Sequence, residues 1–229
     1  LLKNDYARRK SIYINSEFNF MSSFNKGILY IILGSLWWGV IGVIYFRELS
    51  FVGSIELVLH RVFWTAVILI ITTIYLSKWK KFLKICINKK NLFYLILTGI
   101  LIFINWSVWI FAVSTNQIVD ASFGYFIMPI LSVLFGFIFF NEILNKLRIF
   151  SVVLTFFSVL YLFYFYKDFP WIGLTVGLSW SIYNVLRKKI NVDVDLGLLI
   201  ESLIILPFAI IGFFFIYQSG NLNFGIHSI

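Results

Sequence analysis

Charged side chains are scarce in this sequence of 229 residues. Asp, Glu, Lys and Arg make up 13% of it and hydrophobic residues 61%, whereas a soluble domain has about 25% charged and about 45–50% apolar residues. So little polar surface cannot cover a globule in water. The composition therefore excludes an ordinary soluble domain and predicts an integral membrane protein with several spans.

Cysteine and histidine are nearly absent as well. The single cysteine, Cys86, excludes an intramolecular disulfide and a cysteine-based metal site. The two histidines, His60 and His227, form no HExxH motif, and no GxxxxGK[ST] nucleotide-binding motif is present. We therefore expect no metal, no cofactor and no enzymatic activity.

Acidic residues are outnumbered by basic ones, ten against nineteen, which gives a net charge of +9. In a soluble protein this excess would suggest nucleic acid as a partner. Here the basic residues lie between apolar runs and no soluble module presents a basic face, so we expect no nucleic-acid partner. The expected partners are the lipid bilayer and a small-molecule substrate, and a homodimer is the assembly we consider.

Long apolar runs dominate what is present. A helix needs about 20 residues to cross a bilayer core of about 30 Å, and the runs do not alternate polar and apolar residues as barrel strands do. Seven runs qualify approximately: 27–46, 55–76, 91–113, 120–141, 147–166, 169–187 and 196–217.

Lysine and arginine alternate between the segments that flank these runs. Their numbers in chain order are 5, 1, 6, 0, 2, 1, 3 and 0. Because short cytoplasmic loops are enriched in both residues, the pattern predicts a multi-pass protein of the bacterial inner (plasma) membrane with a cytoplasmic N-terminus. Residues 1–26 have no apolar signal-peptide core, and we expect them to form a poorly ordered cytoplasmic extension, with Met21 as the suspected true start.

A short internal repeat relates the first run to the sixth. The sequence S-L-W-W-G (35–39) recurs as G-L-S-W-S (177–181) at an offset of 142 residues. A repeat unit of five spans, an odd number, inserts its second copy upside down. The pattern predicts the inverted repeat that is common in secondary transporters, whose substrate site lies near the bilayer midplane between the halves.

Five stretches, in order along the chain, resemble a known family. They are "ELVLHRVFWT" (56–65), "NWSVWIFAV" (105–113), "DASFGYFIMPILSVLFGFIFFNE" (120–142), "LRKKI" (186–190) and "GLLIESLIILP" (197–207). Together they resemble the RarD-type permeases of the drug/metabolite transporter superfamily, which are built from EamA repeats. One departure is Met128, where the family usually has Asn before the proline.

The resemblance implies an all-α transmembrane bundle of ten spans in two inverted five-helix repeats. Residues 27–166 would form the first repeat and 169–229 the start of an incomplete second one. The implied function is a secondary transporter that exports small organic solutes or drugs by alternating access, and the family name implies a chloramphenicol phenotype. A membrane-embedded enzyme and a truncated, non-transporting membrane protein remain the alternatives.

Three polar residues in the second run are unexpected, because a charged side chain at the centre of a transmembrane helix raises the free energy of membrane insertion by about 2.5–3.5 kcal/mol. Glu56 and His60 lie one turn apart on one helix face, and Arg61 lies about 140° round the helix from Glu56. We expect them to face a polar pathway and to lie close to polar groups of other spans. The alternatives are an arginine that snorkels to the interface and a structural ion pair.

Further polar and aromatic residues complete the predicted site. Glu201 is the best candidate for binding and releasing a proton, unless it lies at the wet interface. For the others the alternative role is interhelical hydrogen bonding. The predicted substrate-binding or pathway residues are Glu56, His60, Arg61, Asn105, Trp106, Tyr125, Trp180, Tyr183, Asn184 and Glu201.

Proline and glycine mark special positions within the runs. Pro129 and Pro207 each remove one helical hydrogen bond, which produces either a break that lines a cavity or a plain kink. Gly173, Gly177 and Ser181 recur at every fourth residue, and this spacing predicts close helix packing.

Overall fold

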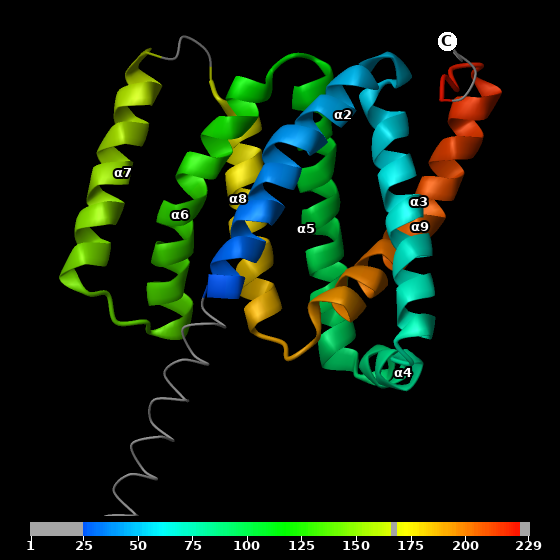
Figure 1. Cartoon of the computed structure of the whole chain (residues 1–229), viewed down its shortest axis with the longest axis horizontal. Coiled ribbons are helices and arrows are strands. Elements are labelled where there is room, and N and C mark those ends of the chain that lie inside the picture. Colours follow the sequence, from blue (N-terminus) through cyan, green and yellow to red (C-terminus); the bar gives the residue numbers. More distant parts are fainter. Residues whose placement is uncertain (1–24, 166–168, 225–229) are drawn as a thin grey trace, which may run out of the picture. The chain divides into compact units, whose positions relative to one another are not determined.

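A computed structural model describes residues 25–165 and 169–224. The expected extension therefore lies almost wholly outside the described residues. The chain divides into two compact units, residues 1–45 and 46–229. The described residues form helices and turns and contain no strand (Figure 1), which confirms the prediction of an all-helical chain.

The helices follow one another with short connections. The first is the helical segment Asn25–Glu48, which contains a π-helical turn, η1 (Trp37–Gly42), and ends with α2 (Val43–Glu48). The others are η2 (Ser50–Val52), α3 (Ser54–Tyr75), α4 (Trp79–Ile87), α5 (Lys89–Ser114), α6 (Ile118–Phe140), α7 (Lys146–Phe165), α8 (Trp171–Lys188) and α9 (Val194–Gln218).

Six helices among the described residues are long and apolar enough to cross a membrane: Asn25–Glu48, α3, α5, α6, α7 and α9. The sixth predicted run, 169–187, coincides with α8, a helix of 18 residues that is not among these six. The prediction of seven spans is therefore met in part. The physical reason is that α8 packs against both α5 and α6 and buries polar Ser179 and Ser181 there, so it needs less apolar surface.

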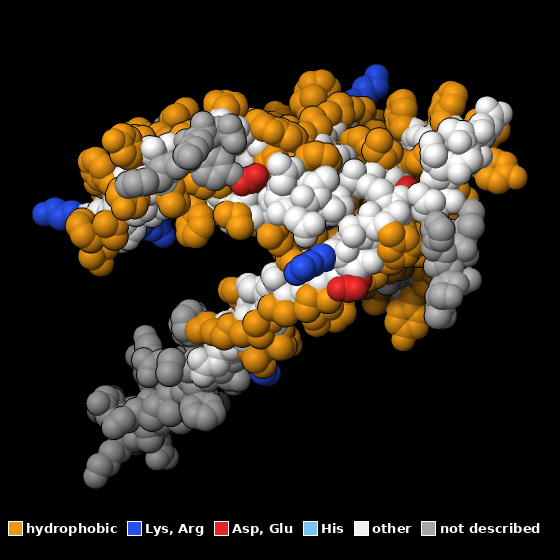
Figure 2. Space-filling view, turned by 90° about the horizontal axis from the view of Figure 1, so that it is seen from above, with side chains coloured by type: hydrophobic (Ala, Val, Ile, Leu, Met, Phe, Trp, Pro, Cys, Tyr) orange, Lys and Arg blue, Asp and Glu red, His pale blue; other side chains and the backbone are white. Residues whose placement is uncertain are grey.

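The prolines do not divide their helices. Pro129 lies inside α6 and Pro207 inside α9, and each helix is continuous through its proline. Of the two alternatives drawn from the sequence, a break into separate half-helices is therefore absent from both. Large hydrophobic side chains remain exposed along the helices, and Figure 2, seen from above, shows many of them around the margins of the described part. Such a surface fits lipid acyl chains.

Within the second unit, the lysine-rich connections gather at one end. The connection that contains α4, the α6–α7 connection and the α8–α9 connection all lie at the lower end in Figure 1. Ion pairs join them: Lys78 Nζ lies 2.5 Å from Asp195 Oδ2, and Lys81 Nζ lies 2.7 Å from Asp193 Oδ2. The α5–α6 connection lies at the other end. The predicted alternation of basic connections thus corresponds to the two ends of the bundle.

Glycines bring α6 and α8 into close contact. A Cβ added to Gly124 would lie 2.6 Å from the carbonyl oxygen of Gly173 and 3.0 Å from the amide nitrogen of Gly177. Real Cβ atoms do not approach backbone this closely, so only glycine fits there. The close packing predicted from the spacing of Gly173 and Gly177 is confirmed.

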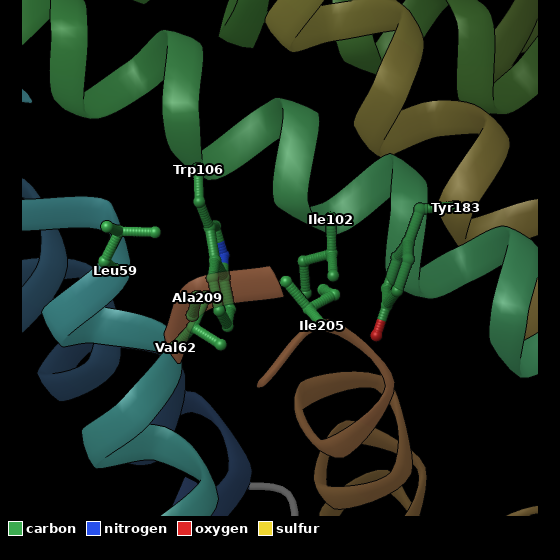
Figure 3. Packing of buried hydrophobic residues seen from close by; sticks show 7 residues of the cluster. All are labelled: Leu59, Val62, Ile102, Trp106, Tyr183, Ile205 and Ala209. Carbon is green, nitrogen blue, oxygen red and sulfur yellow. The ribbon is translucent and has the colours of Figure 1, made fainter. Parts of the chain in front are cut away.

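The core lies where α3, α5, α8 and α9 meet. Helix α8 packs against α5 and α6, and α9 packs against α3 and α5. One buried cluster joins these four helices and is drawn in Figure 3; its members are Leu59, Val62, Ile102, Trp106, Tyr183, Ile205 and Ala209. Helix α5 is therefore the element against which both later helices, α8 and α9, are assembled.

Candidate functional site

The carboxylate of Glu201 is completely buried in the junction of three helices. Thr98 of α5 donates its hydroxyl to Oε1 at 2.6 Å, and Tyr183 of α8 donates its hydroxyl to Oε2 at 3.2 Å. Both oxygens of a side chain on α9 are thus held by neighbouring helices. Glu201 is not at the wet interface, which removes that alternative.

Arg187 supplies positive charge to the same carboxylate. Its Nε lies 3.7 Å from Glu201 Oε1, and its side chain is 11% exposed. One terminal nitrogen, Nη2, donates to the backbone carbonyl of Asp193 at 3.3 Å. Among the described residues, the other terminal nitrogen has no hydrogen-bond partner. Glu201, Arg187, Tyr183 and Thr98 form what we name the inner polar cluster.

Gly197 makes room for the guanidinium of Arg187. A Cβ at position 197 would lie 2.0 Å from Arg187 Nη1 and 2.4 Å from its Cζ. No other residue can occupy that position while Arg187 stays in place. Gly197 and Glu201 lie one turn apart on α9, as Tyr183 and Arg187 do on α8, so both helices present a matched pair to the junction.

A second polar group lies near the opposite end of the bundle, where α3 begins. Glu56 is buried, and its two carboxylate oxygens accept the backbone N–H groups of Asn223 and Phe224 at 3.0 Å each. The Nε2 atom of His60 lies 3.7 Å from Glu56 Oε1, and its ring contacts those of Phe213 and Phe224 at centroid distances of 4.8 and 4.3 Å. Glu56 therefore anchors the segment that follows α9.

The guanidinium of Arg61, one residue after His60, packs against two aromatic side chains. Its guanidinium carbon is 4.1 Å from the centroid of a Trp106 ring and 5.9 Å from that of Phe46. A cation over an indole face gains about 0.5–2 kcal/mol, more where water is excluded. The contact with Trp106 joins two of the predicted site residues and ties α3 to α5.

Glu56 and His60 do not contact the predicted site residues of the other spans, such as Asn105, Tyr183 and Glu201, among the interactions of the described residues. Instead, Glu56 and His60 contact α9 and the segment after it, because α9 packs along α3 and ends beside the start of that helix. The predicted polar residues are consequently split between two groups rather than gathered in one.

The remaining predicted residues serve packing or lie outside both groups. Asn105 donates its amide to the carbonyl of Val176 and to Ser179 Oγ, both at 3.0 Å, so it fastens α5 to α8. Trp180 stacks on Tyr183 at 5.3 Å. Tyr125 and Asn184 are both exposed. Tyr125 interacts electrostatically with Arg61, whereas Asn184 makes no hydrogen bond with either polar group among the described residues.

Apolar side chains separate the two polar groups. Trp106, which contacts Arg61, and Tyr183, which contacts Glu201, belong to the same buried cluster. Figure 3 shows Ile102 and Ile205 between these two aromatic residues. A solute that passed from one polar group to the other would have to displace this layer.

A pocket of about 290 Å³ opens between the start of α3, the second half of α5 and the start of α8. Its lining is almost wholly apolar and includes the two hydroxyl residues Ser54 and Ser107. The other lining residues are Ile55, Val58, Leu59, Phe103, Val108, Phe111 and Trp171. None of the predicted site residues lines it.

Sequence reasoning missed Thr98, Arg187 and Gly197. Arg187 was counted only as a topological charge, together with Lys188 and Lys189. The available signal was the pairing of polar or small residues one turn apart, Tyr183 with Arg187 and Gly197 with Glu201. Among the described residues, no three His, Cys, Asp or Glu side chains are placed to hold a metal ion.

Comparisons with known proteins give a consistent picture. The model of the EamA-like transporter family matches residues 25–164. An uncharacterized transporter of Vibrio cholerae is 36% identical over 186 residues, 81% of this chain and 61% of that protein. Protein RarD of Salmonella typhi is 30% identical over 204 residues, 89% of this chain and 69% of that protein.

A third relative carries a more specific name. The chloramphenicol-sensitive protein RarD of Pseudomonas aeruginosa is 27% identical over 170 residues, 72% of this chain and 57% of that protein. The chain thus spans about three fifths to two thirds of the length of these curated relatives. No solved structure matches the chain.

Proposed function

Because the chain belongs to the EamA-like transporter family and is of the RarD type, we propose that it works in a secondary transporter of the bacterial inner membrane. The transporter exports small organic solutes by alternating access, and its N-terminus is cytoplasmic. The observation that carries this proposal is the inner polar cluster, in which a fully buried carboxylate is held by side chains from three helices.

A buried carboxylate at a helix junction is costly unless it has a function or a partner. Glu201 has hydroxyl donors from α5 and α8 and an arginine from α8. Its charge state therefore affects how firmly α9 is held to α8. We assign Glu201 the coupling role: proton binding loosens its attraction to Arg187, and proton release restores it.

The apolar pocket supports an organic substrate. Ligand pockets have volumes of about 300–1,000 Å³ and apolar linings with a few polar groups, and this pocket has about 290 Å³ and two serines. A small, largely apolar molecule fits this chemistry better than a highly charged one. The pocket is the binding site at the end of the bundle remote from the lysine-rich connections.

Transport can be tested in proteoliposomes with the protein produced from its own gene. Radiolabelled chloramphenicol serves as the probe, since a relative is named for sensitivity to it. Its flux under an imposed pH gradient should exceed that of protein-free vesicles and should be lost in Glu201→Gln, which keeps the shape and one acceptor oxygen. Equal flux in protein-containing and protein-free vesicles rejects chloramphenicol as substrate; full flux in Glu201→Gln rejects the coupling role.

The orientation is tested by labelling one introduced cysteine. In a Cys86→Ser background, Lys84→Cys should react with a membrane-impermeant maleimide only after the cells are opened. Labelling of Lys84→Cys in intact cells would reverse the proposed orientation. A second proposal, that the protein assembles as a homodimer, is tested by chemical cross-linking in the membrane.

A further inference from the structure

Helix α4 lies across the end of the bundle rather than along it. Figure 1 looks down the axis of α4, while α3 and α5, which it connects, are seen from the side. A helix that connects two spans in this orientation lies in the plane of the membrane surface. Its nine residues, WKKFLKICI, contain three lysines and a tryptophan.

The faces of α4 differ in chemistry. Phe82 and Ile85 are buried in a core cluster with residues of α5 and α9. Leu83 and Ile87, four residues apart, share a second face and are 45% and 80% exposed. One face thus holds α4 to the bundle, and another presents apolar side chains outward.

Most of the other exposed residues in and next to α4 are lysines, and they are of two kinds. Lys78 and Lys81 are paired with Asp195 and Asp193. Lys80 and Lys84 share a face of α4 and are exposed, and within the described part of the chain neither has an ion-pair partner. The bundle therefore satisfies some of these charges internally and leaves others directed away from it.

Two more lysines extend the same surface. Lys89 and Lys90 form the first turn of α5 and are exposed, and no acidic residue lies in that turn. Positive charge at a helix N-terminus opposes the helix dipole, so these lysines do not stabilise α5. An anionic partner outside the helix would offset this unfavourable interaction with the dipole.

We propose that α4 and the first turn of α5 form a docking surface for anionic phospholipid headgroups of the protein's own membrane. Leu83 and Ile87 enter the boundary between headgroups and acyl chains, and Lys80, Lys84, Lys89 and Lys90 bind the phosphates. Amphipathic surface helices bind membranes by this combination of apolar area and basic charge. The inference does not depend on transport.

A lipid fits this surface better than a soluble acidic protein does. The exposed apolar side chains lie on a helix that crosses the end of the bundle (Figure 1), and a soluble acidic protein offers them no acyl chains. Trp79, a residue type that is enriched at membrane interfaces, lies on the same helix and stacks on Phe82. The enrichment of lysine in cytoplasmic loops governs insertion and does not specify which lysines contact lipid in the folded protein. Lys78 and Lys81 are already paired with aspartates of the bundle. The other exposed lysines are therefore the ones that remain available to lipid.

The experiment measures lipid selectivity in nanodiscs that contain the full chain. Spin-labelled phosphatidylglycerol and spin-labelled phosphatidylcholine are compared by electron paramagnetic resonance, and the protein-bound fraction of each gives a relative association constant. We expect wild-type protein to prefer phosphatidylglycerol and the K80Q/K84Q variant to lose up to about fivefold of that preference for each lysine. Salt of about 1 M, with a screening length of about 3 Å, should abolish the difference.

Two controls make the result decisive. K146Q/R148Q removes two basic charges from the start of α7 at the same end of the bundle, and it should keep the preference. K78Q/D195N removes an ion pair without changing net charge, and it should keep it too. If K146Q/R148Q reduces the preference as much as K80Q/K84Q does, total charge governs lipid binding and the assignment to α4 is wrong. If K80Q/K84Q retains the preference while folded, the surface serves an acidic protein instead.

Discussion

Removing Arg187 should leave a buried carboxylate without its cation. Arg187 Nε lies 3.7 Å from Glu201 Oε1, and the exposed fractions of the two side chains are 11% and 0%. At an effective dielectric constant of about 20, two unit charges at that separation attract by about 4 kcal/mol. Breaking a buried pair from one side costs about 3–5 kcal/mol. We expect Arg187→Gln to lower the free energy of unfolding by this amount.

The single cysteine provides the assay. Cys86 lies half-buried in α4, and its burial raises the pKa of its thiol, so a maleimide dye reacts slowly until the protein unfolds. For a chain of this size, about 1 kcal/mol shifts the melting temperature by about 2–4 °C. Arg187→Gln should therefore melt roughly 6–20 °C below wild type in detergent.

The double variant separates a lost attraction from lost packing. Arg187→Gln/Glu201→Gln removes both charges and keeps the hydroxyl partners of residue 201, so it should melt above Arg187→Gln alone. The reasoning is refuted if Arg187→Gln melts with wild type, or if the double variant is less stable than Arg187→Gln by the full cost of a second mutation.

Three further predictions concern other parts of the bundle. Gly124→Ala forces α6 away from α8 and should lower the free energy of unfolding by about 1–3 kcal/mol. Gly99→Ala is the control, because its Cβ would meet its nearest atom at 3.5 Å, and this variant should melt close to wild type. Equal melting temperatures of the two variants would contradict the packing argument. Arg61→Lys keeps the charge but loses the planar guanidinium that lies over an indole ring. Chloramphenicol flux into proteoliposomes should therefore fall. Undiminished flux would exclude specific recognition by this guanidinium. The hydrogen bond and charge of Lys188 lower the pKa of Glu142. Their stabilising effect is therefore present above the ordinary carboxyl pKa and disappears as pH falls through the lowered value. Melting temperatures recorded against pH should show this loss of stability in acid for wild type and not for Lys188→Gln.

The positions of the long helices could be predicted from hydropathy and charge alone, because lipid imposes long apolar runs and topology imposes alternating basic loops. The short helix α4 was not predicted, because it lies in a lysine-rich connection and is too short to span a membrane. Helix α8 was placed correctly, although it is less apolar than the others, because the count of basic residues on either side required a helix there. Its Ser179 and the backbone carbonyl of its Val176 accept hydrogen bonds from Asn105 of α5. A hydropathy threshold alone cannot detect a helix whose polar groups are paired inside the protein.

The partners of the polar residues could not be predicted in the same way. Glu56 accepts two backbone N–H groups that follow it by 167 and 168 residues, and backbone donors leave no signature in a sequence. Among three consecutive cations, only Arg187 enters the junction, because Gly197 leaves space at that point. Which side chains meet depends on how far neighbouring helices are shifted along one another, and no local sequence pattern encodes that shift.

The apolar layer between the two polar groups also has an electrical consequence. A bacterial membrane holds a voltage, and moving one elementary charge through it involves about 2.3 kcal/mol per 100 mV. Ile102 and Ile205, packed between Trp106 and Tyr183, offer a proton no oxygen or nitrogen to move along. While these side chains stay packed, a proton finds no polar side chain in this layer that would lead it along the voltage from one buried carboxylate, Glu56, towards the other, Glu201.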